Sequence, residues 1–272
     1  MSVNNTDIFG RKVFFIAPDS SLVPASFMEG FCNLGYESHI LGQGDGSLVE
    51  NIAVITEHFP EAVIFFNIDA ASPGISWLPF IRQLRQQNAG LLVGAVFAAA
   101  NRERTHHVEA EYGGDVSPLA GCIALSPGDS DGNFKALLSA LEKTGAKGRR
   151  NSIRARCDES SSISFGTGGS TFHARIDDVN ISHLCCILDE SGVRGMKIYD
   201  KIRGARICVN GMEFMSDIVL IMKRNKGGIS TAVFMFIRKP DDEPGLEPEL
   251  EPQLNKKIYQ ITSKEFTDLL HK

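Results

Sequence analysis

The chain has 272 residues, of which 43% are hydrophobic and 22% are charged, a composition typical of a globular protein. Its formal net charge of −5 argues against a protein that coats nucleic acid through bulk positive charge. The N-terminus lacks the pattern of a signal peptide, and the longest apolar run, Leu91 to Ala100, is shorter than the roughly 20 residues that span a bilayer. Six cysteines occur without a C-x-x-C pair or a metal-ligand spacing to histidine, which predicts reduced thiols, no metal site and a cytoplasmic location.

The first 142 residues alternate apolar runs with amphipathic segments. The runs expected to be strands are residues 12–17, 37–41, 62–68, 91–97 and 121–125. The segments expected to be helices are residues 22–34, 48–58, 77–87, 101–111 and 132–143. Continuous apolar strands separated by helices indicate a parallel sheet covered on both faces. Five such units predict a doubly wound α/β domain of the flavodoxin type over residues 1–142.

A different pattern follows a basic linker at residues 143–156. Between residues 160 and 238, short alternating segments are separated by Gly, Ser and Asn, which predicts an all-β barrel within a second domain at 157–272. Asn210-Gly211 is a hairpin-turn signal. Residues 240–252 form an acidic, proline-rich segment that we expect to be an exposed loop. We expect a strand fragment at 259–261 and a final helix over 264–270.

Two polar motifs stand at the start of the second domain. Arg150 and Arg154 form an R-x-x-x-R spacing in the linker, and the segment from Asn180 to Cys185 begins N-x-S about 26 residues later. Arginine is suited to phosphate and guanine because its guanidinium is a bidentate donor and a flat stacking surface. Asn180 and Ser182 are two residues apart, so on a strand they share a face. Together these groups are suited to a phosphorylated guanine ligand.

The two motifs, in this order and context, resemble those of the PilZ family, R-x-x-x-R followed by D/N-x-S-x-x-G. The resemblance covers about residues 147–272 and implies a receptor for cyclic di-GMP. It implies that Arg150, Arg154, Asn180 and Ser182 contact the ligand, with Arg149 assisting them. Cys185 stands where the motif has its last Gly. Because a side chain adds bulk there, we expect an effect on affinity and stoichiometry rather than on ligand identity.

The first domain resembles a response-regulator receiver that has lost its phosphorylation residues. The first strand leads to one acid, Asp19, and the third ends at Asn67, where a receiver carries its phosphoacceptor aspartate. The fourth ends in Ala98-Ala99 in place of a hydroxyl, and the fifth gives Ser126-Pro127 without the lysine. Asp69 is a displaced alternative to the acceptor. We therefore expect a domain that makes contacts and does not transfer phosphate.

These observations predict a bacterial, non-enzymatic effector. Cyclic di-GMP would order the arginine linker, and an unidentified protein partner would respond to the resulting change between domains. The resemblance implies outputs such as motility. Two alternatives remain, a ligand-free interaction scaffold with the same fold and a nucleic-acid-binding small barrel. No DNA or RNA partner is expected, because aromatic residues interleaved with basic ones are few in the barrel. No membrane segment is expected, because the apolar runs are too short.

Overall fold

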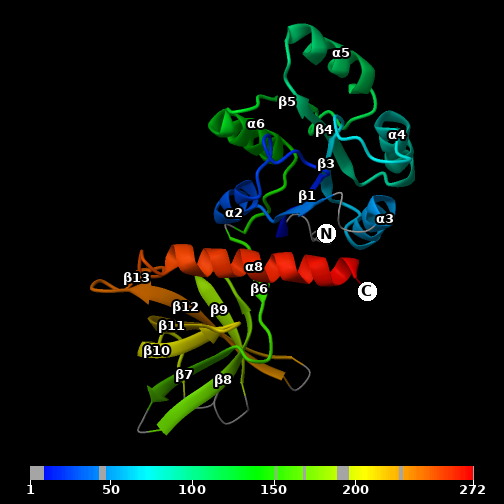
Figure 1. Ribbon diagram of the computed structural model, residues 1–272. Coiled ribbons are helices and arrows are strands. Elements are labelled where there is room, and N and C mark those ends of the chain that lie inside the picture. Colours follow the sequence, from blue (N-terminus) through cyan, green and yellow to red (C-terminus); the bar gives the residue numbers. More distant parts are fainter. Residues whose placement is uncertain are drawn as a thin grey trace. The chain divides into compact units, whose positions relative to one another are not determined.

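The computed structural model describes residues 9–42, 47–150, 152–167, 170–188, 196–226 and 229–271. The chain divides into two compact units (Figure 1). The first comprises Met1–Asn151 with Asp268–Lys272, and the second comprises Ser152–Thr267. Within the described residues, no helix is both long enough and apolar enough to cross a membrane.

The first unit contains a five-stranded parallel sheet with strand order β2-β1-β3-β4-β5. Its strands are β1 (Val13–Ile16), β2 (Ser38–Leu41), β3 (Val63–Asn67), β4 (Leu92–Ala98) and β5 (Cys122–Leu125). Its helices are α2 (Ser26–Asn33), α3 (Leu48–His58), α4 (Trp77–Gln87), α5 (Arg102–Tyr112) and α6 (Ser130–Lys143). This strand order is the flavodoxin-like order, so the predicted doubly wound α/β fold is confirmed.

Consecutive aromatic residues on the central strands β1 and β3 point to opposite faces of this sheet, so both faces are packed with rings. Helices α2 and α6 lie on one side of it, and α3 and α4 lie on the other (Figure 1). Phe15 on β1 stacks on Phe31 of α2, with ring centroids 6.1 Å apart. On the opposite face, Phe66 of β3 lies 5.4 Å from the ring of Trp77, which begins α4. Buried aromatics on both faces explain why these strands read as continuous apolar runs.

Helix α2 begins later than the sequence predicts, at Ser26 and not at residue 22. The backbone N–H groups of Leu22 and Val23 both donate to the carbonyl of Asp19, which closes a turn before the helix. Pro24 follows this turn, and proline is favourable only in the first turn of a helix because it has no N–H to donate. The apolar spacing therefore continued through a turn that precedes the helix.

The second unit contains an antiparallel barrel. Its six principal strands are β7 (Ser162–Thr167), β8 (Ser170–Val179), β9 (His183–Leu188), β10 (Lys201–Val209), β11 (Met212–Lys226) and β12 (Ile229–Arg238). They follow the order β11-β10-β7-β8-β9-β12, and pairing of β11 with β12 closes the barrel. The predicted Asn210-Gly211 turn joins β10 to β11, with both residues at positive φ. The predicted all-β barrel is confirmed.

Two short strands and a long helix complete this part of the chain. Strand β6 (Ala155–Arg156) pairs with β8, so the last residues of the predicted linker belong to the sheet. Strand β13 (Glu243–Pro244) pairs with β12 inside the segment expected to be a loop. Helix α8 spans Glu251–Leu270 and replaces both the expected strand fragment and the shorter helix.

The length of α8 has a physical explanation. Leu254, Ile258, Ile261 and Phe266 are buried at helical spacings, which gives the whole segment one apolar stripe. Pro252 lies in the first turn, where proline is tolerated. The acidic residues before it obscured the start of the helix, but acidic side chains near a helix N-terminus are stabilising. The predicted C-terminal helix is therefore confirmed, with its start corrected to Glu251.

Candidate functional site

The N-x-S segment forms the turn between β8 and β9. The Asn180 side-chain oxygen Oδ1 accepts hydrogen bonds from the backbone N–H groups of Ser182 (2.8 Å) and His183 (2.7 Å) and from the Ser182 hydroxyl (3.0 Å). The backbone N–H of Asn180 donates to the carbonyl of His183 at 2.9 Å. The spacing predicted that the two motif residues share a strand face. This prediction is wrong, because both residues lie in the turn. Asn is suited to such a turn because its short side chain can replace a backbone acceptor.

This arrangement gives the two motif residues different roles. Asn180 is buried and uses its acceptor oxygen within the turn, so the groups that its side chain offers elsewhere are amide N–H donors. Ser182 is half-buried and lies closer to the surface. Guanine presents the acceptors O6 and N7 along one edge, which match the amide N–H donors of Asn180.

His183 also belongs to this turn, although the sequence motif does not include it. Its Nδ1 lies 2.7 Å from the Ser182 hydroxyl. Burial lowers the pKa of His183, and the positive charge of Arg154 lowers it further. A neutral imidazole is therefore the stable form near neutral pH. Its position immediately after Ser182 was the sequence signal that could have identified it.

Arg154 reaches the same region through strand pairing. It immediately precedes β6, in which Ala155 is the register partner of Val179, the last residue before Asn180. Its Nη1 lies 3.3 Å from the Asp178 carboxylate oxygen Oδ1. Its Nε is buried and has no hydrogen-bond partner among the described residues. The structure thus brings Arg154 beside the N-x-S turn, even though the two motifs are separate in the sequence.

The other two predicted arginines lie at the end of the first unit. The Arg150 guanidinium carbon lies 4.1 Å from the centre of the Phe9 ring, which is cation–π geometry. Phe9 itself is 59% exposed, so this contact is at the surface. Arg149 is exposed. Their role in ligand binding stays a prediction.

Cys185, at the position of the motif's final Gly, is in strand β9. It is half-buried and does not have a positive φ, so a side chain is accommodated there without backbone strain. Burial raises the pKa of its thiol to about 11, and the charges of Asp178 and Asp177 contribute. Asp178 is the register partner of Cys185 across β8 and β9. The position expected to disturb ligand binding therefore faces two carboxylates.

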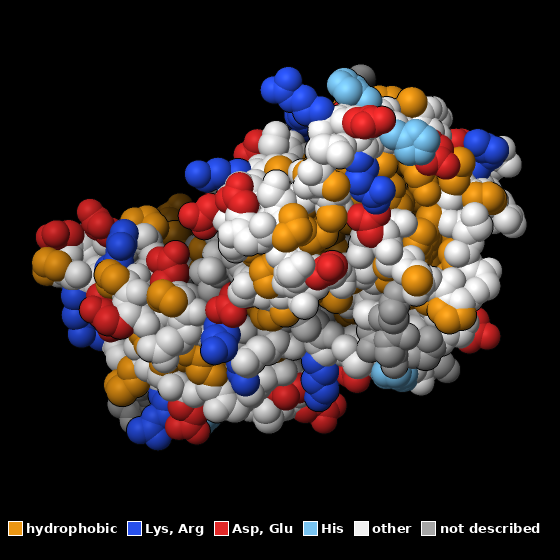
Figure 2. Space-filling model, turned by 45° about the horizontal axis from the view of Figure 1, so that its top comes forward, with side chains coloured by type: hydrophobic (Ala, Val, Ile, Leu, Met, Phe, Trp, Pro, Cys, Tyr) orange, Lys and Arg blue, Asp and Glu red, His pale blue; other side chains and the backbone are white. Residues whose placement is uncertain are grey.

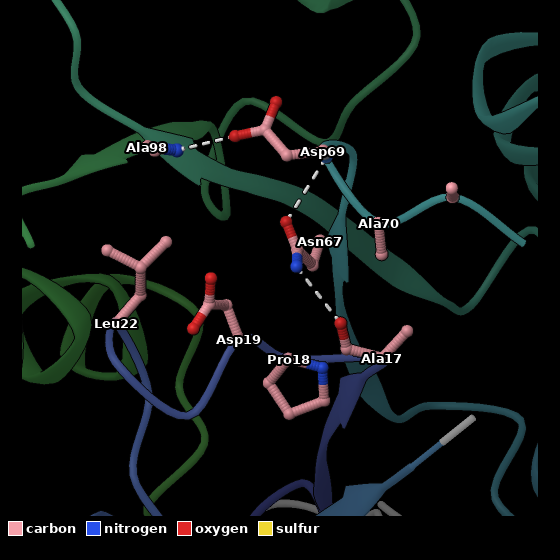
Figure 3. Close-up of a pocket in the computed structure, with 9 residues that line it drawn as sticks. Ala17, Pro18, Asp19, Leu22, Asn67, Asp69, Ala70 and Ala98 are labelled. Atoms are coloured by element: carbon pink, nitrogen blue, oxygen red, sulfur yellow. Dashed lines mark hydrogen bonds between the residues drawn. The ribbon is translucent and has the colours of Figure 1, made fainter. Parts of the chain in front are cut away.

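A separate pocket of about 450 Å³ lies at the carboxyl edge of the parallel sheet (Figure 3). Such an edge, between β1 and β3, is where doubly wound folds commonly bind ligands. Asn67 lines the pocket, and its amide donates to the carbonyl of Ala17 at 3.0 Å (Figure 3). Its Oδ1 accepts from the backbone N–H of Asp69 at 3.2 Å. Asn67 therefore connects the ends of two strands at the position where a receiver has its acceptor.

Asp69, the displaced alternative acceptor, is already engaged. One carboxylate oxygen accepts the backbone N–H of Ala98 at 2.7 Å (Figure 3). The other forms an ion pair with Arg104 from α5. Asp19, the remaining acid of this pocket, accepts the backbone N–H of Ser21. Hydrogen bonding by the side chain of Ser21, and then by its backbone, lowers the pKa of Asp19. At this edge of the sheet, the two carboxylates are therefore engaged in holding neighbouring segments of the chain in place.

No family model matches the chain, and no curated protein matches it. Among solved structures, it is similar to YcgR from Escherichia coli in complex with c-di-GMP, with 16% identity over 44% of this chain and 48% of that chain and a TM-score of 0.37. It is also similar to the PilZ domain of YcgR with c-di-GMP (16% identity, 43% and 94% covered, TM-score 0.35). A third is the MrkH–c-di-GMP complex from K. pneumonia (10% identity, 44% and 54% covered, TM-score 0.37).

A solved PilZ domain is thus among the similar structures. PilZ is the family that the two sequence motifs resemble. The similarity spans about half the length of YcgR and of MrkH. The ligands named for those structures are theirs, and a ligand for this chain is a proposal.

Proposed function

We propose that the second unit binds cyclic di-GMP at the turn between β8 and β9, with Arg154 as its principal cation. The observation that carries this proposal is the pairing of β6 with β8, which brings Arg154 next to the turn that contains Asn180 and Ser182. A guanidinium and a group of short hydrogen-bonding side chains thereby meet on one side of the barrel. These are the groups that a phosphodiester and a guanine edge require.

The proposal gives the chain a receptor role and no catalytic one. Arg149 and Arg150 would join the ligand from the linker, and Arg150 would exchange its contact with Phe9 for a contact with nucleotide. Ordering of this linker would change how the two units are connected, and an unidentified protein partner would respond to that change. Control of motility or of related surface behaviour is the output that the family resemblance suggests.

Calorimetric titration of the full chain with cyclic di-GMP tests the proposal. We expect saturable binding by the wild type and a loss of at least about tenfold in affinity for Arg154→Ala, since a charged hydrogen bond to phosphate contributes roughly 1.5–3 kcal/mol. Arg206→Ala is the matched control, because Arg206 is exposed on β10 and the variant loses the same charge. Absence of binding by the wild type, or equal affinities in the two variants, would contradict the proposal.

The two alternatives make different predictions. A ligand-free scaffold would give no heat with the nucleotide while the chain remains folded. A nucleic-acid-binding barrel would shift labelled oligonucleotides on a gel at moderate salt, where we expect no shift. On the face drawn in Figure 2, acidic and basic side chains of the described residues are interspersed, whereas a nucleic-acid surface gathers basic side chains together.

A further inference from the structure

We propose that Asp177, Asp178 and Cys185 form a site for a borderline-soft divalent cation, of which Zn²⁺ is the representative. One ligating atom from each of the three side chains lies within 4.8 Å of the other two. In a tetrahedral shell with bonds of 2.0–2.3 Å, neighbouring ligand atoms are about 3.5 Å apart. Small side-chain rotations would therefore bring the three atoms into coordination distance.

A β-bulge creates this group. The register of β8 and β9 shifts between Ile176, which is opposite Cys186, and Asp178, which is opposite Cys185. Asp177 is the extra residue. Ile176 is buried inside the barrel, whereas Asp177 and Asp178 are both more exposed, so two consecutive side chains are on the outer face. A regular strand would send one of them inward, and the bulge is what aims both toward Cys185.

The ligand chemistry selects the class of cation. Thiolate is a soft ligand that favours Zn²⁺ and similar ions, while Mg²⁺ and Ca²⁺ prefer oxygen alone. Three protein ligands leave a further position for water or another molecule, as in open zinc sites. Coordination forms a bond between the metal and the Cys185 sulfur, and the thiol proton passes to the buffer.

One cation of the chain already contacts this group, and a bound metal would share a carboxylate with it. The Arg154 guanidinium lies beside it, with Nη1 3.3 Å from Asp178 Oδ1. Arg154 can retain that contact when a metal binds the other carboxylate oxygen, because carboxylate ligands commonly accept an outer hydrogen bond. The inference goes beyond the proposed function, since the three side chains require no nucleotide to bind a metal.

The test uses Co²⁺ as a spectroscopic probe on the full reduced chain without nucleotide. We expect one equivalent of Co²⁺ to produce a thiolate-to-metal charge-transfer absorption, Zn²⁺ to abolish it, and Mg²⁺ to leave it unchanged. Cys185→Ser should remove the band. Cys208→Ser is the matched control, because Cys208 is also a half-buried strand cysteine and its loss should leave the band intact.

Asp177→Asn and Asp178→Asn provide a second arm that keeps Cys185 in place. Each should weaken metal affinity by about tenfold or more, measured by competition with a chromophoric chelator while circular dichroism verifies the fold. Absence of the band in the wild type, its persistence in Cys185→Ser, or unchanged affinity in both Asp variants would overturn the proposal. A separate nucleotide titration shows whether cyclic di-GMP binding fails independently.

Discussion

At the scale of single residues, the contact between Arg154 and Asp178 has a direct consequence for the proposed receptor. The carboxylate holds the guanidinium that we assign to the ligand, and it also places a negative charge beside an anionic phosphodiester. Asp178→Asn should therefore raise the affinity for cyclic di-GMP by about three- to tenfold, the effect expected for one partly exposed charge. Calorimetry at low and high salt checks this, because screening should reduce the gain.

The control for this variant is Glu213→Gln. Glu213 is exposed on β11, so the substitution changes the net charge by the same amount away from the turn. Equal gains in the two variants would assign the effect to net charge. A loss of affinity in Asp178→Asn would mean that Asp178 positions Arg154 for the ligand and does not compete with it.

Glu37 gives a pH-dependent prediction in the first unit. Burial alone would raise its pKa, but hydrogen bonding by His39 and the charge of Lys12 outweigh burial and lower the pKa from 4.5 to about 2. A lowered folded-state pKa stabilises the protein above the ordinary pKa, and this contribution is lost as the pH falls from about 4.5 to about 2. Glu37→Gln should thus lower the free energy of unfolding by roughly 1–3 kcal/mol at neutral pH.

Chemical denaturation of wild type and Glu37→Gln across this range measures that contribution. The two unfolding free energies should converge as the pH approaches 2, because the wild-type carboxylate then becomes protonated. A constant difference between the two proteins at all pH values would show that the substitution acts through packing instead.

At the scale of elements, the turn between β8 and β9 depends on one side-chain oxygen. Asn180→Ala removes the acceptor for the backbone N–H groups of Ser182 and His183, so we expect a destabilisation of about 1–3 kcal/mol together with weaker nucleotide binding. Asn180→Asp retains an acceptor oxygen at this position and should keep most of the stability. Thermal unfolding of both variants, followed by titration, separates the turn from ligand contact. Equal destabilisation by Ala and Asp would contradict this role for Oδ1.

The same scale shows what a sequence can and cannot predict here. Helices α3 and α4 were predicted with their observed bounds, because each has a clear apolar stripe and follows a serine. The predicted C-terminal helix is shorter than α8, because the acidic first turn and Pro252 are typical of a loop. The spacing predicts Arg154, Asn180 and Ser182 as site residues, and the structure brings the three together. The grouping of Asp177 and Asp178 with Cys185 was not, because it depends on strand register and on a bulge.

At the scale of the whole molecule, our proposal gives the second unit a nucleotide ligand and gives the first unit no phosphoryl transfer. In the first unit, Asn67 occupies the expected acceptor position and the Asp69 carboxylate is paired with Arg104. Incubation with acetyl phosphate and Mg²⁺ should therefore add no phosphoryl group, as measured by intact-mass spectrometry. A receiver with an intact acceptor is the positive control. A stoichiometric mass addition that disappears in Asp69→Asn would show that Asp69 leaves its ion pair and reacts.

The only tryptophan of the chain, Trp77, offers an optical consequence of this arrangement. Its indole N–H donates to the carbonyl of Ala70 at 2.7 Å, in the segment that lines the pocket of the first unit. Tryptophan emission therefore reports on the first unit, while Arg154 and the turn that we assign to cyclic di-GMP are in the second. A change in tryptophan emission on adding nucleotide would show, without a label and in real time, that binding to the second unit alters the environment of Trp77 in the first.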